Sequence, residues 1–471
     1  MIDLKSLTIE KAHASLKNKE FTAVELAQAY LKVIEEKNPE INAYLEVYDD
    51  VLEQAEIADK KFADGSATLM TGIPTAIKDN ILIKSRIVSA GSKILGNYRA
   101  AYDATAIKYL KGVGAVFLGR TNMDEFAMGS STQTSAYGVT KNPVDLSRVP
   151  GGSSGGSAAA LASNMALAAL GTETCGSVRE PSAFCGLVGL KPTYGAVSRE
   201  GIIAMGNSLD QVSPFGKCVR DTEIIFNLTS KYDEEDSTSV PESLRITQSK
   251  INSKKIGVPW HLFKEGVDRD VLENFKESIE KLKKLGYEIV DIELPHAKYS
   301  LAAYYIIMPA EVSTNLSRFD GIRYGHSAKG VDLMEVYKKS RGEGFGREAR
   351  RRIILGTYVL SHGYYDAYYN KAVKIREKIK EEVMEVLQKV DYILTPTVPI
   401  TAFKLGEKMD DPVAMYLCDI FSAPANLSGV PSLALPSGLS KEGLPFSIQF
   451  MASHFREDLL FEVGKEFEKA K

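Results

Sequence analysis

The hydrophobic positions of this chain alternate between short runs with strand-like spacing and longer repeats with helical spacing. Near the start, Thr22 to Glu25 (TAVE) predicts a capping box, because the hydroxyl and the carboxylate can each bond a free backbone N–H. An amphipathic helix follows to about Lys37, and we expect Asn38 and Pro39 to end it, since proline lacks the N–H donor that a helix interior needs. From Gly72 onward, runs such as IPTAI and GAVFLG alternate with helical patterns such as TAIKYLKGVG. This rhythm predicts alternating layers of strands and helices.

The second half of the chain resumes the rhythm after a polar interruption. Residues 231–255 are acidic and then basic, which predicts a surface excursion. After it, KKIGVPW predicts a strand, Asp268 to Leu285 a charged amphipathic helix, and YEIVDIELP a second strand. We expect a long helical block over Arg347 to Leu387, followed by a buried strand in DYILTPTVP. No internal repeat is visible.

Composition narrows the class of protein. Of 471 residues, 44% are hydrophobic and 25% charged, which is the balance of a soluble globular protein with a large core. The formal charge of −3 and the lack of a long basic run argue against an independent nucleic-acid binder. Any RNA that the protein serves is therefore expected to be held by a partner.

Cysteine spacing and apolar run lengths indicate the compartment. The four cysteines form neither a CxxC pair nor a dense framework, so we interpret them as free thiols in a reducing compartment: Cys175, Cys185, Cys218 and Cys418. The N-terminal sequence MIDLKSLTIEKAH lacks the apolar core of a secretory signal. No run reaches the roughly 20 apolar residues that a membrane-spanning helix needs. A cytoplasmic protein without membrane contact is expected.

Two loops rich in glycine and serine are the most informative part of the chain. They lie between Gly151 and Gly176, where GGSSGGSAAALA is followed by GTETCGSVREP. Glycines permit positive φ angles and close approach of a substrate to the backbone. A phosphate-binding loop is an alternative interpretation, but the GK[ST] ending of that motif is missing.

A serine nucleophile requires a base, and histidine is the usual one. None of the six histidines lies in or near the serine-rich loops. Lys78 follows an apolar run in GIPTAIKDN and could serve if burial keeps its amine neutral, which takes about 4 kcal/mol for a shift of roughly three pKa units. The alternative is that Lys78 simply pairs with Asp79 at the end of a strand. The residues alone leave both interpretations open.

The chain resembles the amidase-signature family over residues 72–215. The similarity rests on GIPTAIKDN, GRTNMDEFAMGSS, VPGGSSGGSAAALA, GTETCGSVREPSAFCGLVGLKPTYG and SLDQVSPFG. The resemblance implies a Ser-Ser-Lys triad, with Lys78 as base, Ser153 as relay and Ser177 as nucleophile. It also implies an oxyanion hole built from the backbone N–H groups of the preceding loop, namely Thr174, Cys175, Gly176 and Ser177. Ser154 and Arg179 are expected to support these loops, and no metal is expected.

The same resemblance predicts the fold. We expect an α/β protein with a mixed, twisted central β-sheet that helices cover on both faces. Residues 1–471 would form a single domain, with residues 72–215 as its signature core and residues 231–255 as a surface excursion.

Three positions depart from the family pattern. Cys175 and Glu180 stand where glycine and glutamine are usual, and Glu173 replaces the more common aspartate. If Cys175 needs a left-handed backbone, its side chain costs on the order of 1 kcal/mol. Activity could then be lowered or the substrate altered. Cys175 is also an alternative nucleophile, although Ser177 keeps the alignment with both triad partners.

Within the family, the chain is similar to the A subunits of aspartyl/glutamyl-tRNA amidotransferases. This similarity rests on three segments, ELPHAKYSLAAYYIIMPAEVSTNLSRFDGIRYG, EGFGREARRRIILGTYVLSHGYYDAYYNKA and MYLCDIFSAPANLSGVPSLALPSG. The similarity implies that glutamine is bound by Tyr304, Arg352 and Asp419, which fits an amino acid's carboxylate and ammonium. Arg351 is a close rival of Arg352. Core packing for Tyr304 and a helix-end charge for Asp419 are the alternatives.

The resemblance also implies partners. In such complexes a B subunit uses ATP and magnesium to activate misacylated Glu-tRNA or Asp-tRNA, and a small C subunit bridges the two larger chains. We therefore expect a heterotrimer, tRNA contact mainly through the B subunit, and no cofactor in this chain. Two competing hypotheses are a stand-alone amidase that acts on other carboxamides and a catalytically weak scaffold subunit.

Overall fold

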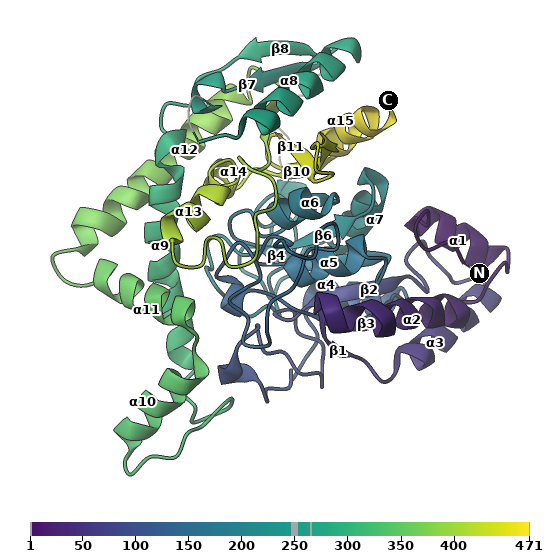
Figure 1. Cartoon of the computed structure of the whole chain (residues 1–471), viewed down its shortest axis with the longest axis horizontal. Coiled ribbons are helices and arrows are strands. Elements are labelled where there is room, and N and C mark those ends of the chain that lie inside the picture. The colour runs from purple at the N-terminus through teal and green to yellow at the C-terminus, as the bar shows by residue number, and fades with distance from the viewer. Residues whose placement is uncertain (1, 246–252, 264–265, 471) are drawn as a thin grey trace.

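A computed structural model of the protein describes residues 2–245, 253–263 and 266–470. Within these residues, all eleven strands belong to one sheet, in the order β1-β3-β2-β4-β6-β5-β10-β11-β9-β7-β8. Figure 1 shows the strands extending through the molecule, from β1 to β3 beside α2 and α3 to β7 and β8 at the opposite end. The strands are β1 (Tyr44–Val47), β2 (Pro74–Lys78), β3 (Val116–Thr121), β4 (Ala168–Glu173), β5 (Val188–Lys191), β6 (Gln211–Gly216), β7 (Lys255–Val258), β8 (Glu288–Asp291), β9 (Tyr392–Pro396), β10 (Ser432–Leu439) and β11 (Pro445–Met451).

The sheet is mixed. β3, β2 and β4 run parallel to one another, and so do β9, β7 and β8, whereas the strands between these two groups pair antiparallel. The central strands β2, β3, β4, β5, β6, β9 and β11 are buried along their whole length, so both faces of the sheet are covered. The predicted fold class is confirmed.

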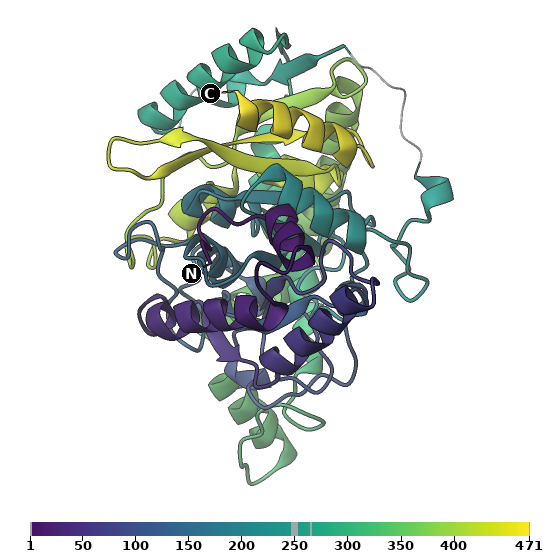
Figure 2. The same cartoon turned by 90° about the vertical axis from the view of Figure 1, so that its right-hand side faces the viewer.

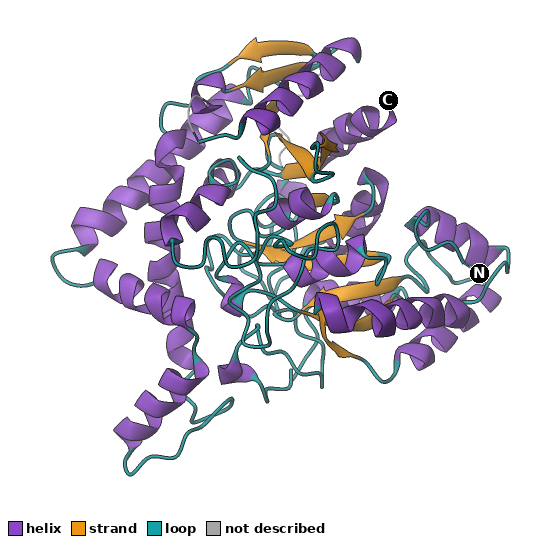
Figure 3. Ribbon diagram, in the orientation of Figure 1, coloured by secondary structure: helices purple, strands orange, loops and turns teal. Residues whose placement is uncertain are grey.

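Helices flank the strands on both sides, as Figure 3 shows. In Figure 1, α9 to α12 lie on one side of the molecule, and α1 to α3 lie at the opposite side beside β1 to β3. The helices are α1 (Ile9–Lys17), α2 (Ala23–Ile41), α3 (Val51–Ala63), α4 (Thr105–Gly112), α5 (Gly155–Ala162), α6 (Arg179–Cys185), α7 (Val219–Thr229), α8 (Arg269–Lys284), α9 (Ser300–Asn315), α10 (Leu333–Gly344), α11 (Arg347–Val359), α12 (Asn370–Val386), α13 (Pro412–Tyr416), α14 (Ala423–Ser428) and α15 (Glu457–Lys469).

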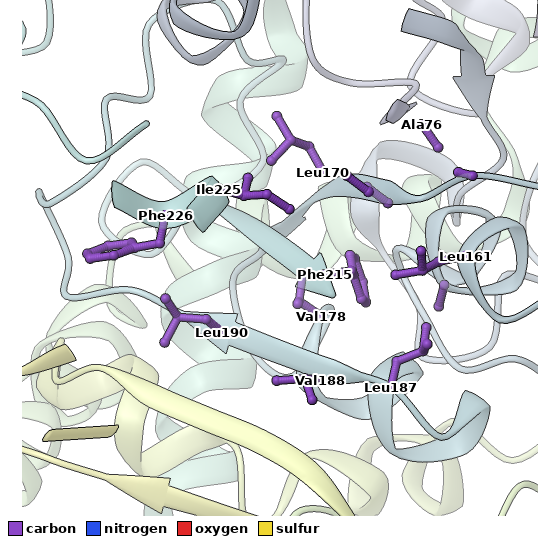
Figure 4. Close-up of a cluster of buried hydrophobic side chains, with 14 of the residues drawn as sticks. Ala76, Leu161, Leu170, Val178, Leu187, Val188, Leu190, Phe215, Ile225 and Phe226 are labelled. Atoms are coloured by element: carbon purple, nitrogen blue, oxygen red, sulfur yellow. The ribbon is translucent and has the colours of Figure 1, made fainter. Parts of the chain in front are cut away.

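The core forms where strands from distant parts of the sequence meet. Figure 4 shows Leu170 of β4, Leu190 of β5 and Phe215 of β6 in one cluster with Leu161 of α5 and Ile225 of α7. Figure 2 shows the C-terminal hairpin of β10 and β11, in yellow, beside the last helix α15. Because β10 pairs with β5, the last fifth of the chain completes the sheet on which the signature segment is built.

The predicted N-terminal helix begins as expected but ends later. Thr22 Oγ1 accepts from the Glu25 N–H at 3.0 Å, and the Glu25 carboxylate accepts from the Thr22 N–H at 2.8 Å, which confirms the capping box. The expected end at Asn38 and Pro39 is wrong, because α2 continues to Ile41 and closes on the left-handed residue Asn42. Pro39 lies in the last turn, where the missing N–H removes only one of the final hydrogen bonds.

Two further predictions are corrected or limited by the structure. The helical block over 347–387 is not continuous, since α11 ends at Val359 and a π-helical segment, Tyr365–Tyr369, precedes α12. Gly363 in the break has a φ of +85°, a left-handed conformation that suits glycine. Of the predicted surface excursion, residues 246–252 lie outside the described residues.

Among the residues that the structure describes, no helix combines the length and the apolar character that crossing a bilayer requires.

Candidate active site

Parallel strands bring the predicted catalytic segments to one edge of the sheet. Lys78 is the last residue of β2, and Glu173 is the last residue of the neighbouring strand β4. The carboxyl ends of parallel strands face the same way, so the loops that follow them meet. The segment 174–177 follows β4 directly, and α5, which follows the Gly151–Ser154 loop, packs on β4 and β2.

The Lys78 amine is fully buried among oxygen atoms. Its Nζ lies 2.8 Å from Ser153 Oγ, 2.7 Å from Ser154 Oγ and 3.1 Å from the Thr172 carbonyl oxygen. Burial lowers the pKa of Lys78 to about 7, although the nearby carboxylates, Asp124 first among them, favour the charged form. A large share of the amine is therefore neutral near pH 7.

The alternative pairing of Lys78 with Asp79 is wrong. Asp79 turns away and accepts hydrogen bonds from Ser89, from the Gly91 N–H at 3.0 Å and from Arg120 at 3.0 Å. Within the described residues, Lys78 forms no ion pair. A lysine amine that has no carboxylate partner and is shielded from water is suited to proton transfer.

Backbone contacts hold the two serine loops together. A cis peptide bond joins Gly152 to the buried Ser153, and the Ser154 N–H donates to the Ser177 carbonyl oxygen at 3.1 Å. Ser177 is only 3% exposed. Its hydroxyl makes no hydrogen bond in the part of the chain that the structure describes, so the second link of the expected relay, from Ser177 to Ser153, is not formed in this state.

Glu173 organises the loop that follows β4. Its carboxylate accepts from the N–H groups of Gly176 at 2.9 Å, Val178 at 3.2 Å and Arg179 at 3.3 Å. Arg179, itself fully buried, forms an ion pair with Glu173 and donates to Gln449 at 2.6 Å. Burial is the largest single influence on Glu173 and opposes its ionisation, but the charge and hydrogen bond of Arg179, the charge of Lys191 and the Gly176 N–H together outweigh it and lower the pKa of the carboxyl.

This arrangement changes the expected set of oxyanion donors. The Gly176 N–H already donates to Glu173. The N–H groups of Thr174, Cys175 and Ser177 make no hydrogen bond to any of the described residues. These three donors, rather than four, are free to bind a substrate oxygen.

Cys175 fits the loop without the strain that its side chain could have caused. The left-handed position is Gly176, with a φ of +78°, and not Cys175. A Cβ atom at Gly176 would lie 2.7 Å from Asp419 Oδ1, so glycine is required at that position. Burial raises the pKa of the Cys175 thiol well above its usual range, which disfavours the thiolate that a cysteine nucleophile needs.

A cavity of about 200 Å³ lies beside these loops. Its lining includes Ser130 and Ser131, which adjoin the Gly152 backbone, and both candidate arginines, Arg351 and Arg352. The two arginines differ in exposure, since the side chain of Arg351 is 33% exposed and that of Arg352 is 3% exposed.

Arg352 is held in a fixed orientation by its neighbours. Its Nε donates to Glu348 Oε1 at 2.7 Å, and its guanidinium carbon lies 5.0 Å from the ring centres of both Tyr305 and Tyr416. Within the described residues its Nη2 makes no hydrogen bond. The two rings are stacked on each other with their centres 3.8 Å apart, so the guanidinium lies beside the pair. A buried guanidinium held in this way, with a free nitrogen, is a suitable partner for a substrate carboxylate.

Tyr304 and Asp419 lie on the same side of the nucleophile loop. The Tyr304 hydroxyl is 2.9 Å from Thr174 Oγ1, and Tyr305 donates to Asp419 Oδ2 at 2.8 Å. Asp419 Oδ1 is buried without a hydrogen-bond partner in the described structure. Burial raises the pKa of Asp419 to about 7. An unpaired carboxylate oxygen in a buried site lacks a donor, which a substrate ammonium could supply.

Several residues around the site were not identified from the sequence. Tyr305 contacts both Arg352 and Asp419, and Glu348 orients Arg352. Asp124 accepts from the N–H groups of Thr132 and Thr134 at 2.8 Å and 3.1 Å and lies beside Gly152. The tandem tyrosines in AAYYII were the one available signal for Tyr305, but spacing alone could not show which ring faces which group.

Glu180 is an acid in surroundings that suit a neutral group. Both of its carboxyl oxygens are buried and lack hydrogen-bond partners among the described residues. Burial, followed by the charges of Asp419 and Asp124, raises its pKa well above the usual range. A protonated glutamic acid has the size and neutrality of glutamine, which explains how Glu180 can occupy a position where glutamine is usual.

Comparison with known proteins gives matches over the whole chain. The A subunit of glutamyl-tRNA(Gln) amidotransferase from Thermoanaerobacter pseudethanolicus is 48% identical over 475 residues, covering 100% of this chain and 97% of that protein. The protein of the same name from Koribacter versatilis is 49% identical over 477 residues, covering 100% of this chain and 99% of that protein.

Solved structures agree with these matches. The crystal structure of the glutamyl-tRNA(Gln) amidotransferase A subunit from Thermotoga maritima superposes with a TM-score of 0.82 at 41% identity, covering 100% of this chain and 96% of that one. The native peptide amidase from Stenotrophomonas maltophilia superposes with a TM-score of 0.83 at 27% identity, covering 99% and 97%. The profile of the family described as Amidase matches residues 25–461. This chain therefore belongs to the amidase family.

Proposed function

We propose that this chain is the glutamine-hydrolysing A subunit of a tRNA-dependent amidotransferase, and that Lys78, Ser153 and Ser177 are its catalytic residues. The observation that carries the proposal is the buried Lys78 amine bonded to two serine hydroxyls, beside a cavity lined by Arg352. The full-length similarity to A subunits named for this activity supports the choice of substrate.

The contacts of Lys78 suggest which serine relays the proton. A neutral amine has two N–H donors and one lone pair. The Thr172 carbonyl can only accept, and Ser154 Oγ donates to that carbonyl at 3.1 Å, so both are expected to accept from the amine. The lone pair then remains for the Ser153 O–H. Ser154 is accordingly a supporting residue that orients the amine.

In the proposed reaction a proton passes from Ser177 through Ser153 to Lys78, and one is later returned along the same residues to the leaving nitrogen. Lys78 takes the proton of Ser153, Ser153 takes that of Ser177, and the Ser177 oxygen attacks the carboxamide carbon of glutamine. The N–H groups of Thr174, Cys175 and Ser177 stabilise the oxyanion. The C–N bond breaks as the relay returns the proton to nitrogen, and ammonia leaves. Water then cleaves the Ser177 ester and releases glutamate.

The amino-acid end of glutamine is proposed to lie between Arg352, which lines the cavity, and the residues Asp419 and Tyr304 next to the nucleophile loop. Arg352 is proposed to bind the α-carboxylate, Asp419 Oδ1 the α-ammonium, and Tyr304 to border the bound substrate. Both Arg351 and Arg352 pair with Glu348 at 2.7 Å, so the choice rests on burial: the side chain of Arg351 is 33% exposed and that of Arg352 is 3% exposed. Charge complementarity at both ends selects a free amino acid over a simple amide.

The ammonia is proposed to be used by partner subunits. A B subunit that binds ATP and Mg²⁺ would convert Glu-tRNA(Gln), Asp-tRNA(Asn) or both to the amidated forms, with a C subunit completing a cytoplasmic heterotrimer. In that arrangement the B subunit makes most of the tRNA contacts, consistent with the formal charge of −3 on this chain.

A stepwise experiment tests the proposal. The chain should be co-purified with candidate partners of the B and C types and assayed for ammonia release from glutamine and for glutamine-dependent amidation of Glu-tRNA and Asp-tRNA. Ser177→Ala should lose both activities yet keep amidation from added ammonium salts, since the B subunit needs only ammonia. Ser157→Ala, a hydroxyl bonded to Thr121 and Leu170 rather than to Lys78, is the matched control.

Two further outcomes separate the alternatives. A stand-alone amidase would hydrolyse simple carboxamides as well as glutamine, and Arg352→Ala would leave its rate unchanged. A scaffold subunit would assemble with its partners but release no ammonia. Retention of glutamine hydrolysis by Ser177→Ala would refute the proposed nucleophile.

A further inference from the structure

We propose that Glu125 is a positioning residue that holds helix α11, and through it Arg352, at the distance from the nucleophile loops that glutamine requires. This inference rests on the proposed function, because it assigns Glu125 a part in binding the amino-acid end of the substrate. It concerns a side chain outside the triad, in the short helical turn Glu125–Ala127 that follows β3.

Glu125 closes the N-terminus of α11. The Gly346 N–H, immediately before the helix, donates to Glu125 Oε1 at 3.0 Å and to Oε2 at 2.9 Å. Gly346 itself offers no side-chain cap. A carboxylate in this position satisfies a free N–H and complements the positive end of the helix dipole. The contact also needs glycine, since a Cβ atom at Gly346 would collide with Glu125 Oε2.

The contact is built into the core rather than made at the surface. Glu125 is 1% exposed, and the Ser92 hydroxyl donates to its Oε1. The adjacent Phe126 packs on Phe345 and Phe319, with ring centres 5.6 Å and 5.2 Å away. The turn before α11 is therefore clamped by both a carboxylate and an aromatic ring from the same short segment.

The same helix carries the residues that face the cavity. Glu348, Arg351 and Arg352 lie in its first two turns and line the cavity. A shift of the Gly346 end would move the Arg352 guanidinium relative to Ser177. Because Arg352 is proposed to hold only the non-reacting end of glutamine, such a shift is expected to weaken substrate binding rather than to slow the chemical step.

The neighbouring residue links this clamp to the serine loop. Asp124 accepts from the N–H groups of Ser131, Thr132 and Thr134, and a Cβ atom at Gly152 would collide with its Oδ2. Two adjacent carboxylates thus face in different directions, Asp124 to the loop before Ser153 and Glu125 to α11. Their shared backbone sets the spacing between the reacting end and the amino-acid end of the site.

The test compares Glu125→Gln with a matched cap elsewhere in the full chain. The amide keeps the volume and one acceptor oxygen but removes the charge and the second acceptor. Asp332 caps α10 by accepting from the Glu335 N–H at 2.7 Å, and α10 contributes no residue to the cavity. Asp332→Asn therefore reports the effect of weakening a helix cap without moving Arg352.

We expect Glu125→Gln to raise the KM for glutamine and the inhibition constant of L-glutamate by about tenfold each, with kcat changed by less than about threefold. Asp332→Asn should alter neither constant. Ser92→Ala removes another hydrogen-bond partner of Glu125 and should also raise both constants. It replaces Glu125→Gln in the test if that variant does not fold.

Unchanged constants for glutamine and glutamate in a folded Glu125→Gln or Ser92→Ala variant would overturn the inference. A fall in kcat alone would also overturn it, because that pattern indicates a general structural role. Failure of the proposed function would give a different result from failure of this inference. In that case the parent chain, without any substitution, would release no ammonia from glutamine.

Discussion

Replacing Lys78 by methionine should stabilise the protein at neutral pH while abolishing its activity. Burial lowers the pKa of Lys78 to about 7, whereas an unfolded lysine has a pKa of about 10.4. Between these two values the unfolded chain binds a proton that the folded chain has released, so the unfolded state is favoured as pH falls. At pH 7 this difference costs the folded state about 4 kcal/mol.

Methionine has a similar length and no charge, so it removes that cost but also removes hydrogen bonds. All three hydrogen bonds of the amine are lost, but the Thr172 carbonyl still accepts from Ser154, so only the contacts to Ser153 Oγ and Ser154 Oγ are counted as a cost. At about 1 kcal/mol for each lost bond, the loss is about 2 kcal/mol. The net expectation is a gain of about 2 kcal/mol in the free energy of unfolding at pH 7.

The difference in free energy of unfolding between Lys78→Met and the parent should change sign at high pH. Near pH 10.5 the lysine is neutral in the folded chain and about half neutral in the unfolded chain, so the cost of burial falls to a few tenths of a kcal/mol. The lost hydrogen bonds then dominate, and Lys78→Met becomes the less stable protein by about 2 kcal/mol. Urea unfolding followed by circular dichroism at both pH values measures this difference, and the titration of other groups cancels between the two proteins.

A second buried lysine provides the control. Burial also lowers the pKa of Lys191 to about 7, but its Nζ contacts the Pro192 carbonyl and Gln211 rather than a serine. Lys191→Met should show the same dependence of stability on pH and keep glutamine hydrolysis. A stability difference between Lys78→Met and the parent that moves by less than about 1 kcal/mol over this range would refute the reasoning.

Three further predictions concern the acids and the thiol of the site. Burial brings the pKa values of Lys78 and Asp419 to about 7, and both groups must lose a proton for activity. At acidic pH, kcat/KM measured by ammonia release should therefore fall by more than about tenfold for each pH unit. A fall of only about tenfold for each pH unit would mean that only one group titrates. Burial raises the pKa of Glu180, so its folded form keeps a proton that the unfolded chain releases, and stability falls as pH rises above the unfolded value of about 4.3. Glu180→Gln should remove that loss and raise the melting temperature at pH 8, and an unchanged temperature would show that Glu180 is ionised. Cys175→Gly should change kcat by less than about threefold, because only the N–H of this residue faces the substrate; a large gain in ammonia release would instead support the scaffold hypothesis.

Much of the architecture is encoded locally and could be predicted from the sequence. The capping box at Thr22 and the strands that end at Lys78 and Thr121 depend on neighbours within a few residues, because apolar runs and caps act over short range. The glycine-rich and serine-rich strings likewise marked the segments that now surround Lys78. The mixed sheet was predicted from the resemblance of long sequence segments to a known family. Periodicity alone predicted only alternating strands and helices.

Contacts between distant segments could not be predicted in this way. Tyr305 and Asp419 are 114 positions apart, and Glu125 and Gly346 are 221 apart, yet each pair is joined by hydrogen bonds. The occupation of the Gly176 N–H by Glu173 and the left-handed backbone at Gly176 rather than Cys175 are also decided by the folded loop. Sequence patterns predict which helix or strand a segment forms and which of its side chains share one face. Only tertiary packing decides which of them lose water, and therefore which amine becomes neutral and which carboxylate remains without a partner.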